Sequence, residues 1–136
     1  MKRILILTEK FSAGHLYKND NFSESDNKKY FGKCHTKYGH GHNYRLEVGF
    51  VIPEKTSEIG LKKIKTQLQK KIFSLTNHLD HSHLNFDIAE FKKTIPTTEN
   101  LVLYFEAKIK KLKLKNQLHH LRLYESDDLF SELSYE

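Results

Sequence analysis

Apolar and polar residues alternate along residues 42–52, and this pattern constrains the fold more than any other feature of the chain. Tyr44, Leu46, Val48 and Phe50 fall on one side of an extended segment, because successive side chains of a β-strand point to opposite faces. Pro53 follows and cannot continue the pairing of a central strand. The segment is therefore predicted to be a strand with one buried face.

A second strand is predicted near the N-terminus. Residues 3–10 begin with the apolar run Ile4 to Leu7 and then alternate through Thr8 and Glu9 toward Phe11. We expect this strand to pair antiparallel with residues 42–52.

Two amphipathic helices are predicted in the middle of the chain, because apolar residues recur there at steps of three and four. The second helix begins after Pro96, where Thr97 or Thr98 can cap it and Glu99 suits the positive end of the helix dipole. The apolar positions are Leu61, Ile64, Leu68, Ile72, Leu75 and Leu79 in the first helix and Leu101, Phe105, Ile109 and Leu112 in the second.

The C-terminal part is predicted to form a β-hairpin. Residues 118–125 and 129–135 are the two strands, joined across residues 126–128. The expected order is ββααββ, which describes an α+β domain: a four-stranded antiparallel sheet with two helices on one face. Residues 1–136 form this single domain, and the polar residues 19–33 are expected to be a mobile surface loop.

Composition is typical of a water-soluble globular protein, with 38% hydrophobic and 29% charged residues. The longest apolar stretch, Ile4 to Leu7, is too short to cross a membrane or to form the core of a signal peptide. A single cysteine, Cys34, excludes an intrachain disulfide and suits a reducing compartment. We therefore expect a cytoplasmic protein that does not associate with membranes.

The formal net charge of +6 favours an anionic partner, which could be nucleic acid, an acidic surface or a phosphorylated small molecule. The densest basic segment, residues 108–115, alternates with apolar residues, as the exposed face of a helix end does. No nucleic-acid-binding motif accompanies the charge, so nucleic acid is not the expected partner.

Three histidines are candidate metal ligands. The run His40-Gly41-His42 leads into the strand predicted at residues 42–52, and its two histidines lie two apart, so in an extended chain both can project to the same side. Antiparallel pairing would bring His15, at the far end of the first strand, beside them. Three nitrogen ligands leave a fourth position of zinc open, as in catalytic sites.

The alternative is coincidence, because nine histidines in a short chain give some close spacings by chance. His81 and His83 follow a helix, where a spacing of two does not share a face. His119 and His120 are adjacent in a strand and are expected to point in opposite directions.

Cys34 is a candidate for proton transfer, because Lys33, His35 and Lys37 would favour its thiolate. The alternative is a small buried apolar residue, which is the usual role of a lone cysteine. Asp80 and His81 resemble a general-base pair, although a histidine at a helix C-terminus also interacts favourably with the helix dipole.

Glu125 closes a predicted strand and should point inward, on the same side as Leu121 and Leu123. A buried carboxylate needs a partner. That partner could be a salt-bridging cation or a flat, amide-like heterocycle.

Taken together, these segments resemble the pterin synthase family that contains 6-pyruvoyltetrahydropterin synthase and 6-carboxytetrahydropterin synthase. The resemblance covers nearly the whole chain. The matching segments, in the family's order, are Phe11-Ser12-Ala13-Gly14-His15, Phe31-Gly32-Lys33-Cys34, Gly39-His40-Gly41-His42-Asn43-Tyr44, Leu79-Asp80-His81, Pro96-Thr97-Thr98-Glu99-Asn100 and Tyr124-Glu125.

The resemblance implies a tunnelling fold (T-fold) in a hexamer of two stacked trimers, with active sites between subunits. It implies the substrate 7,8-dihydroneopterin triphosphate, a polyanion that would also account for the basic charge. The implied residue roles are zinc at His15, His40 and His42, proton transfer by Cys34, Asp80 and His81, pterin anchoring by Glu125, and a pterin pocket lined by Thr98 and Glu99.

Two activities of this family compete. Loss of acetaldehyde and triphosphate gives 6-carboxy-5,6,7,8-tetrahydropterin, on the route to queuosine, and the short chain favours this product. The alternative, 6-pyruvoyltetrahydropterin on the route to biopterin, is favoured by the Phe31 to Cys34 run and its spacing to His40. A non-catalytic pterin- or metal-binding module and a basic zinc protein that binds nucleic acid are the hypotheses from other classes.

Overall fold

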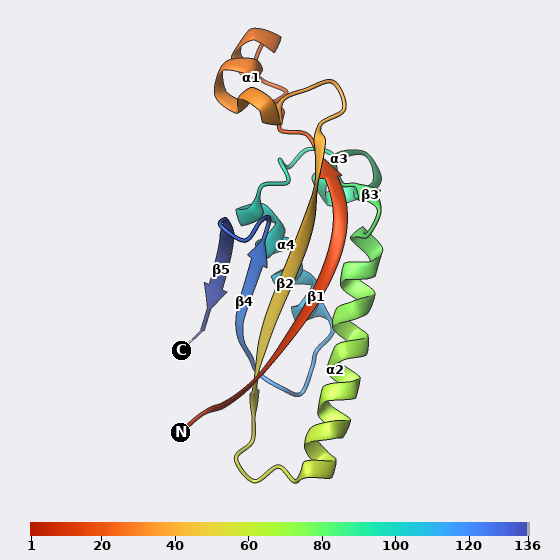
Figure 1. Ribbon diagram of the computed structural model, residues 1–136, viewed down its shortest axis with the longest axis vertical. Coiled ribbons are helices and arrows are strands. Elements are labelled where there is room, and N and C mark those ends of the chain that lie inside the picture. The colour runs from red at the N-terminus through yellow and green to blue at the C-terminus, as the bar shows by residue number, and fades with distance from the viewer. Residues whose placement is uncertain (136) are drawn as a thin grey trace.

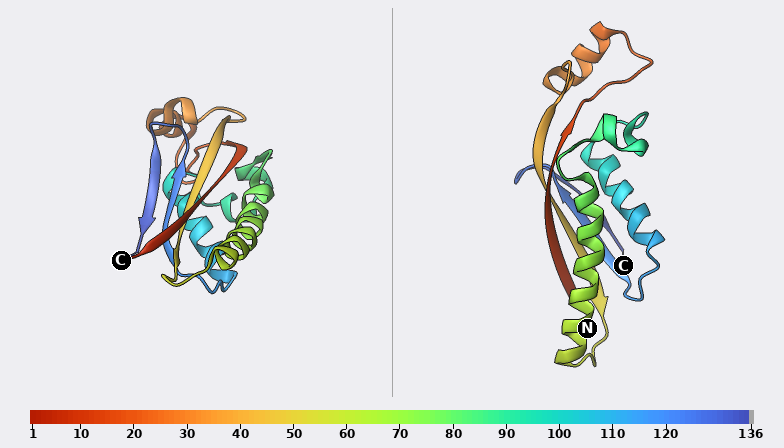
Figure 2. Two further views of the ribbon diagram at one scale, coloured as in Figure 1. Left: turned by 60° about the horizontal axis from the view of Figure 1, so that its bottom comes forward. Right: turned by 90° about the vertical axis from the view of Figure 1, so that its right-hand side faces the viewer.

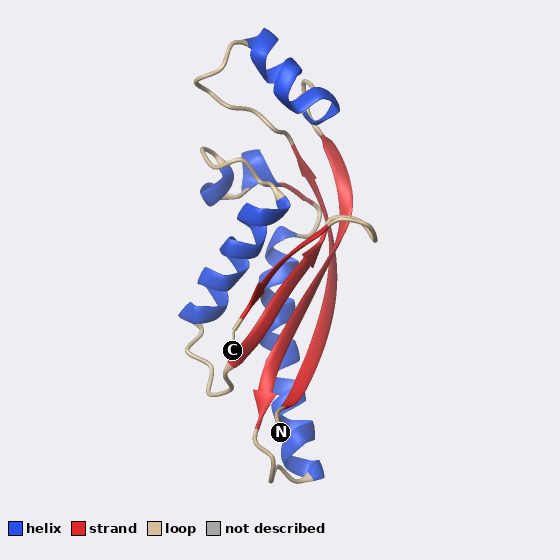
Figure 3. Ribbon diagram, turned by 90° about the vertical axis from the view of Figure 1, so that its left-hand side faces the viewer, coloured by secondary structure: helices blue, strands red, loops and turns tan. Residues whose placement is uncertain are grey.

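The computed structural model describes residues 1–135 and arranges them in two layers, a sheet and the helices that cover one of its faces (Figure 3). The strands are β1 (Arg3–His15), β2 (His40–Ile52), β3 (Ser82–His83), β4 (Leu118–Tyr124) and β5 (Phe130–Ser134). The helices are α1 (Glu24–Phe31), α2 (Glu58–Leu79), α3 (Leu84–Asp87) and α4 (Thr98–Lys111), with the 3-10 helices η1 (Gly32–Cys34) and η2 (Ala89–Phe91). The predicted α+β class is confirmed.

The centre of the sheet is the long antiparallel pair of β1 and β2, whose register runs from Arg3 opposite Ile52 to His15 opposite His40. The strand order is β3-β1-β2-β4-β5, and β4 and β5 form the predicted hairpin (Figure 1). The antiparallel pairing of the first two strands is therefore confirmed, and β1 extends to His15, beyond the segment predicted from alternation.

The sheet has five strands, and the expectation of four was incomplete. The additional strand β3 pairs parallel with β1 through Ser82 opposite Ala13 and His83 opposite Gly14. Two residues are too few to show any alternation, so sequence periodicity cannot reveal such a strand.

The helices α2 and α4 cover the same face of the sheet, as predicted (Figure 2, right). Each begins at a side-chain cap: the Ser57 hydroxyl accepts a hydrogen bond from Gly60 N–H, and the Thr97 hydroxyl accepts one from Asn100 N–H. Between the layers lie the buried residues of the predicted stripes, including Val48, Ile72 and Phe105. This core fixes which face of β1 and β2 is turned toward the helices.

None of the helices within residues 1–135 is both long and apolar enough to span a bilayer. The longest, α2, has 22 residues, and only one side of it is buried.

The segment predicted to be a mobile loop, residues 19–33, instead contains α1 and most of η1, so that prediction was wrong. The Ser23 hydroxyl caps α1 by accepting a hydrogen bond from Asp26 N–H. The helix was missed because a single residue in it, Asn27, is buried, so no apolar stripe marks it in the sequence. In Figure 1, α1 lies beyond the ends of β1 and β2 rather than on the sheet.

Candidate metal centre

Three imidazoles meet at the end of the β1–β2 pair. The register places His15 opposite His40 and Ala13 opposite His42, so all three side chains share the helix-facing side of the sheet. The Nε2 atom of His40 lies 3.1 Å from that of His15 and 2.9 Å from that of His42. The predicted convergence of the three histidines is present in the structure.

Glu125 joins this group from the end of β4. Its Oε1 atom lies 2.8 Å from His42 Nε2, and its Oε2 atom accepts a 2.8 Å hydrogen bond from the Thr98 hydroxyl. Single ligand atoms of His15, His40, His42 and Glu125 all lie within 4.8 Å of one another. We refer to these four residues as the metal cluster.

The inward direction of Glu125 agrees with the prediction from strand alternation, and its side chain is 11% exposed. Its contact with His42 was not foreseen, because nothing in the sequence shows that the end of β4 reaches the start of β2. The carboxylate is placed both to serve as a fourth metal ligand and to accept hydrogen bonds from a heterocycle.

The environment of His15 keeps it neutral. Burial lowers the pKa of His15 to about 3, and the neighbouring His42 and His40 add to the shift. Its Nδ1 atom lies 2.9 Å from the Tyr44 hydroxyl. When Nδ1–H donates to that oxygen, Nε2 presents a lone pair toward the other two rings, as a metal ligand must.

The donor set fits zinc. A tetrahedral zinc ion with Zn–N distances of about 2.0–2.1 Å holds its ligand atoms about 3.3 Å apart, close to the separations seen here. Imidazole nitrogens with a nearby carboxylate are the ligands of many catalytic zinc sites. Burial also lowers the pKa of His42, against the opposing effect of Glu125, so protonation does not block this ligand near neutral pH.

Cys34 ends η1 and is partly buried, and its carbonyl accepts a 2.8 Å hydrogen bond from Tyr17 N–H. We expected basic neighbours to favour the thiolate, and this was wrong. Burial and the charge of Glu125 both raise the pKa of the Cys34 thiol. The charge of Glu125 therefore acts on Cys34 as well as on His42.

His35, which follows Cys34, is held by two contacts: Nδ1 lies 3.0 Å from the Tyr17 carbonyl oxygen and Nε2 lies 3.0 Å from Glu24 Oε1. These contacts attach α1 to the segment that carries Cys34. His35 thus has a structural position rather than the role of activating the thiol.

Asp80 and His81 form the expected pair, with Asp80 Oδ2 2.9 Å from His81 Nδ1. Asp80 Oδ1 also accepts a 2.8 Å hydrogen bond from Ser12 N–H, which holds the pair at the edge of β1. His81 lines a hollow of about 300 Å³ together with Ser12, Asn43 and His42 of the metal cluster. The side chains of Ser12 and Asn43 alternate along their strands with the histidines of the cluster. Across residues 1–135, no hydrogen bond or ion pair joins this pair to Cys34 or to the metal cluster.

Of the two residues expected to line a pterin pocket, Thr98 is buried against Glu125, whereas Glu99 is exposed in the first turn of α4. The structure therefore brings Thr98 to the metal cluster and leaves Glu99 on the surface beside it.

Two features of the surroundings were missed. Tyr44 contacts a candidate ligand, although alternation had marked it only as a core residue. The other is His83. Its buried Nδ1 atom has no hydrogen-bond partner within residues 1–135. Its Nε2 atom lies 2.8 Å from the carbonyl oxygen of Tyr38, a residue of the segment just before His40.

The prediction for His119 and His120 was also wrong. Their Nδ1 atoms lie 2.9 Å apart, and His120 Nε2 lies 2.9 Å from Glu47 Oε2. The register shifts between Gly49 and Phe50, so His119 has no partner residue on β2 and the alternation of β4 is broken there.

Comparison with known proteins agrees with this geometry. Residues 4–136 match the family model described as 6-pyruvoyl tetrahydropterin synthase. The chain is 35% identical to 6-pyruvoyl tetrahydrobiopterin synthase of Dictyostelium discoideum, covering 96% of each chain, and 32% identical to that of Homo sapiens, covering 87% of this chain and 81% of the human one. It is also 28% identical to dihydroneopterin monophosphate aldolase of Pyrococcus furiosus, covering 99% of this chain and all of the relative.

Among solved structures, 6-pyruvoyl tetrahydropterin synthase of Caenorhabditis elegans superimposes with a TM-score of 0.88 at 27% identity, covering all of this chain and 97% of the other. This match confirms the expected T-fold. The sequence, the fold and the histidine cluster lead to one conclusion: the chain belongs to the 6-pyruvoyl tetrahydropterin synthase family.

Proposed function

We propose that the protein is a zinc-dependent lyase that converts 7,8-dihydroneopterin triphosphate to 6-pyruvoyltetrahydropterin with loss of triphosphate. The observation that carries the proposal is the metal cluster, in which three histidine Nε2 atoms and a carboxylate converge at the end of β1 and β2. The sequence favoured the 6-carboxy product of the queuosine route. The named relatives instead support the pyruvoyl product, so we adopt the alternative.

His15, His40 and His42 would hold the zinc through their Nε2 atoms, with Tyr44 orienting the His15 ring. When bound, zinc supplies a Lewis acid that makes the carbons next to coordinated side-chain hydroxyls more acidic. Glu125 is placed to accept hydrogen bonds from the N–H groups of the pterin ring, and its bond from Thr98 keeps the carboxylate in position.

The raised pKa of Cys34 gives this thiol a proton to donate in the resting protein. To act as a base it must first pass that proton to an acceptor. The Asp80–His81 pair is such an acceptor, because the carboxylate stabilises the imidazolium that results. Since the pair lies on the other side of the sheet in the same chain, we propose that it acts on the Cys34 of a neighbouring subunit.

This arrangement requires a homo-oligomer with active sites between subunits, and the hexamer of two trimers is the form we propose. We further propose a cytoplasmic location, since the thiol must stay reduced to transfer protons and the chain has one cysteine.

Product analysis tests the proposal. Zinc-loaded protein incubated with 7,8-dihydroneopterin triphosphate should release triphosphate and a pterin with the mass of the pyruvoyl product, and Cys34→Ala should abolish release while zinc stays bound. Release of acetaldehyde would identify the 6-carboxy reaction instead. If the protein binds a pterin but shows no turnover, the protein is a non-catalytic binding module and the proposal is contradicted.

The archaeal relative supports a second candidate, an aldolase that acts on dihydroneopterin monophosphate. An aldolase breaks a carbon–carbon bond of the side chain and leaves the phosphate ester intact, so its aldehyde product keeps the phosphate. Offering the monophosphate and triphosphate in parallel and identifying the phosphorylated product distinguishes the two reactions.

A further inference from the structure

A basic hollow lies beside the metal cluster and is separate from it. Its volume is about 550 Å³, and it opens between the segment after β1 and the segment before α4. Leu16, which lines it, directly follows His15, and Ile95 precedes Pro96, whose backbone is close enough to influence the pKa of His15. The hollow therefore adjoins the metal cluster along the chain at two places.

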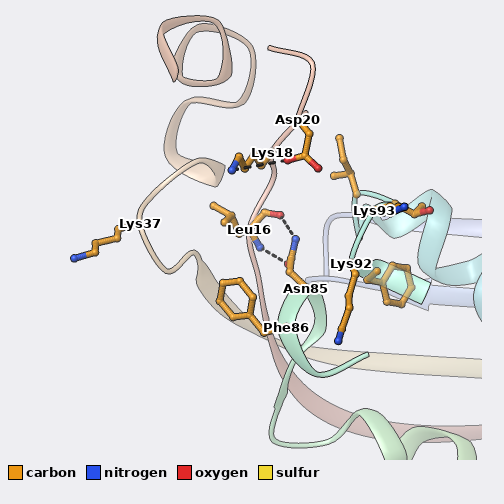
Figure 4. Close-up of a pocket in the computed structure, with 11 residues that line it drawn as sticks. Leu16, Lys18, Asp20, Lys37, Asn85, Phe86, Lys92 and Lys93 are labelled. Carbon is orange, nitrogen blue, oxygen red and sulfur yellow. Dashed lines mark hydrogen bonds and ion pairs between the residues drawn. The ribbon is translucent and has the colours of Figure 1, made fainter. Parts of the chain in front are cut away.

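Four lysines line this hollow: Lys18, Lys37, Lys92 and Lys93. Figure 4 shows Lys18 and Lys92 on different sides of it, Asn85 between them, and Lys37 extending outward at one end. The ammonium groups come from three separate segments of the chain, so the fold rather than a basic run in the sequence collects them. We refer to the lining as the lysine hollow.

The positive charge of the lysine hollow is mostly uncompensated. Within residues 1–135, Asp20 is the one carboxylate that lines it, and its Oδ1 atom lies 3.8 Å from Lys18 Nζ. Lys37, Lys92 and Lys93 form no ion pair with any residue between 1 and 135. Four flexible ammonium groups with one weak internal partner favour a multivalent anion.

The floor of the lysine hollow is built rigidly. Leu16 N–H donates a 2.8 Å hydrogen bond to Asn85 Oδ1, and Asn85 Nδ2–H donates a 2.7 Å bond to the Leu16 carbonyl. This pair of bonds holds α3 against the end of β1, so Lys18 and the Lys92–Lys93 segment keep a fixed separation. The backbone beneath the lysines is therefore already in place when an anion binds, so only their side chains need to become ordered.

A second hollow on the other side of Lys18 and Lys37 suits an anion less well. It is lined by Lys28 and also by Glu24, whose carboxylate lies 3.0 Å from His35 Nε2. The carboxylate would repel a phosphate there. Of the lysines in residues 18–37, Lys18 and Lys37 are therefore better placed for anion binding than Lys28.

We propose that the lysine hollow binds the triphosphate of the substrate. This inference rests on the proposed function, because the triphosphate is attached to the same side chain whose hydroxyls would bind the metal. The phosphates must then lie a few atoms from the metal cluster, and the lysine hollow is a basic cavity that adjoins it. Lys18, Lys92 and Lys93 neutralise the phosphates and hold the leaving group.

The first test measures binding of inorganic triphosphate to the zinc-loaded protein by calorimetry. Replacing Lys18, Lys92 and Lys93 with alanine should raise the Kd at least tenfold and flatten its dependence on salt. The control removes the same kind of charge elsewhere: Lys62→Ala with Lys63→Ala, on the exposed side of α2, should leave the Kd unchanged. All these side chains are exposed, so the variants should fold.

The second test uses turnover and separates this inference from the proposed function. With 7,8-dihydroneopterin triphosphate, the triple variant should show a raised KM, while binding of unphosphorylated 7,8-dihydroneopterin should be unchanged. If the parent protein turns over the substrate and the triple variant has the same KM and the same Kd for triphosphate, the lysine hollow is not the site and the lyase assignment stands. If lysine-dependent triphosphate binding occurs without turnover, the lyase assignment fails and the anion site stands.

Nucleic acid is the competing occupant. If a short single-stranded RNA binds the lysine hollow more tightly than inorganic triphosphate, and the triple variant loses that binding, the small-molecule assignment is overturned.

Discussion

The two faces of the sheet at the end of β1 and β2 carry different halves of the expected chemistry. On the helix-facing side lie the histidines of the metal cluster with Glu125, whose charge also helps to raise the pKa of the Cys34 thiol. On the other side, His81 shares a hollow with Ser12 and Asn43. The same alternation of side chains that brings the histidines together turns Ser12 and Asn43, beside the Asp80–His81 pair, to the opposite face.

We therefore expect that a substitution can remove metal binding or proton transfer without removing the other. All four residues of the metal cluster come from one chain, so binding of zinc should need no other subunit. The Asp80–His81 pair of the same chain makes no hydrogen bond to Cys34 within residues 1–135, so under the proposed mechanism turnover should require contact between chains.

The largest expected effects come from comparing one substitution in the metal cluster with one in the Asp80–His81 pair. His42→Ala removes a ligand and should reduce zinc affinity roughly 100-fold or more, since loss of an outer-shell partner alone costs about 10- to 100-fold. His81→Ala should leave zinc content unchanged and abolish triphosphate release. Metal analysis after dialysis, together with the product assay, measures both. A His81→Ala protein that loses its zinc would show that the two faces are not independent.

Mixing two inactive variants tests whether the halves come from different chains. Cys34→Ala supplies an intact His81, and His81→Ala supplies an intact Cys34. If each site takes Cys34 from one subunit and His81 from the next, random reassembly should restore about a quarter of the parental activity.

The control for this mixing experiment is the same pair of proteins combined without dissociation and reassembly, which should stay inactive. Absence of any recovery after verified subunit exchange would mean that both groups serve one site within a chain.

Glu125→Gln separates the two roles that the geometry allows for this carboxylate. As the pterin anchor, Glu125 makes charge-assisted hydrogen bonds worth about 1.5–3 kcal/mol each, so the variant should bind pterin about 10- to 100-fold more weakly and keep its zinc. Fluorescence titration with a pterin and metal analysis give the two readouts. Loss of zinc with little change in pterin affinity would instead make Glu125 the fourth ligand.

The central pairing and the histidine positions were predictable because the two-residue period of a strand is local. Tyr44, Leu46 and Val48 define the buried face of β2. His40 and His42 are also even-numbered positions of this strand, so they point to the same face. The two long helices were predictable for the same reason, from a period of three to four residues and the cap at Thr97.

The remaining features depend on contacts that no local period encodes. The helix α1 has no apolar stripe, and its attachment through His35 and Glu24 joins residues eleven positions apart. The approach of Glu125 to His42 joins different strands, and a register shift brings His119 to His120. Tertiary packing determines each of these contacts, so they could not be predicted from local patterns in the sequence.

The last expected effect concerns pH, and it isolates His15 on the helix-facing side. The folded protein holds this imidazole neutral down to about pH 3, whereas the unfolded chain takes up a proton near pH 6.5. Its contribution to stability is therefore present above pH 6.5 and is lost as the pH falls toward 3, at up to about 1.4 kcal/mol per pH unit. Denaturant unfolding of zinc-free protein across this range measures the slope.

His15→Gln is the matched variant for this measurement, because glutamine retains a hydrogen-bonding side chain that does not titrate. Its unfolding free energy should depend less on pH between 6.5 and 3 than that of the parent. The exposed His78, in the last turn of α2, supplies the control, since His78→Gln removes a histidine without touching the buried imidazole and should retain more of the parental slope than His15→Gln. Equal slopes for the parent and His15→Gln would show that the unfolding of the zinc-free chain is not governed by the neutral imidazole at the centre of the metal cluster.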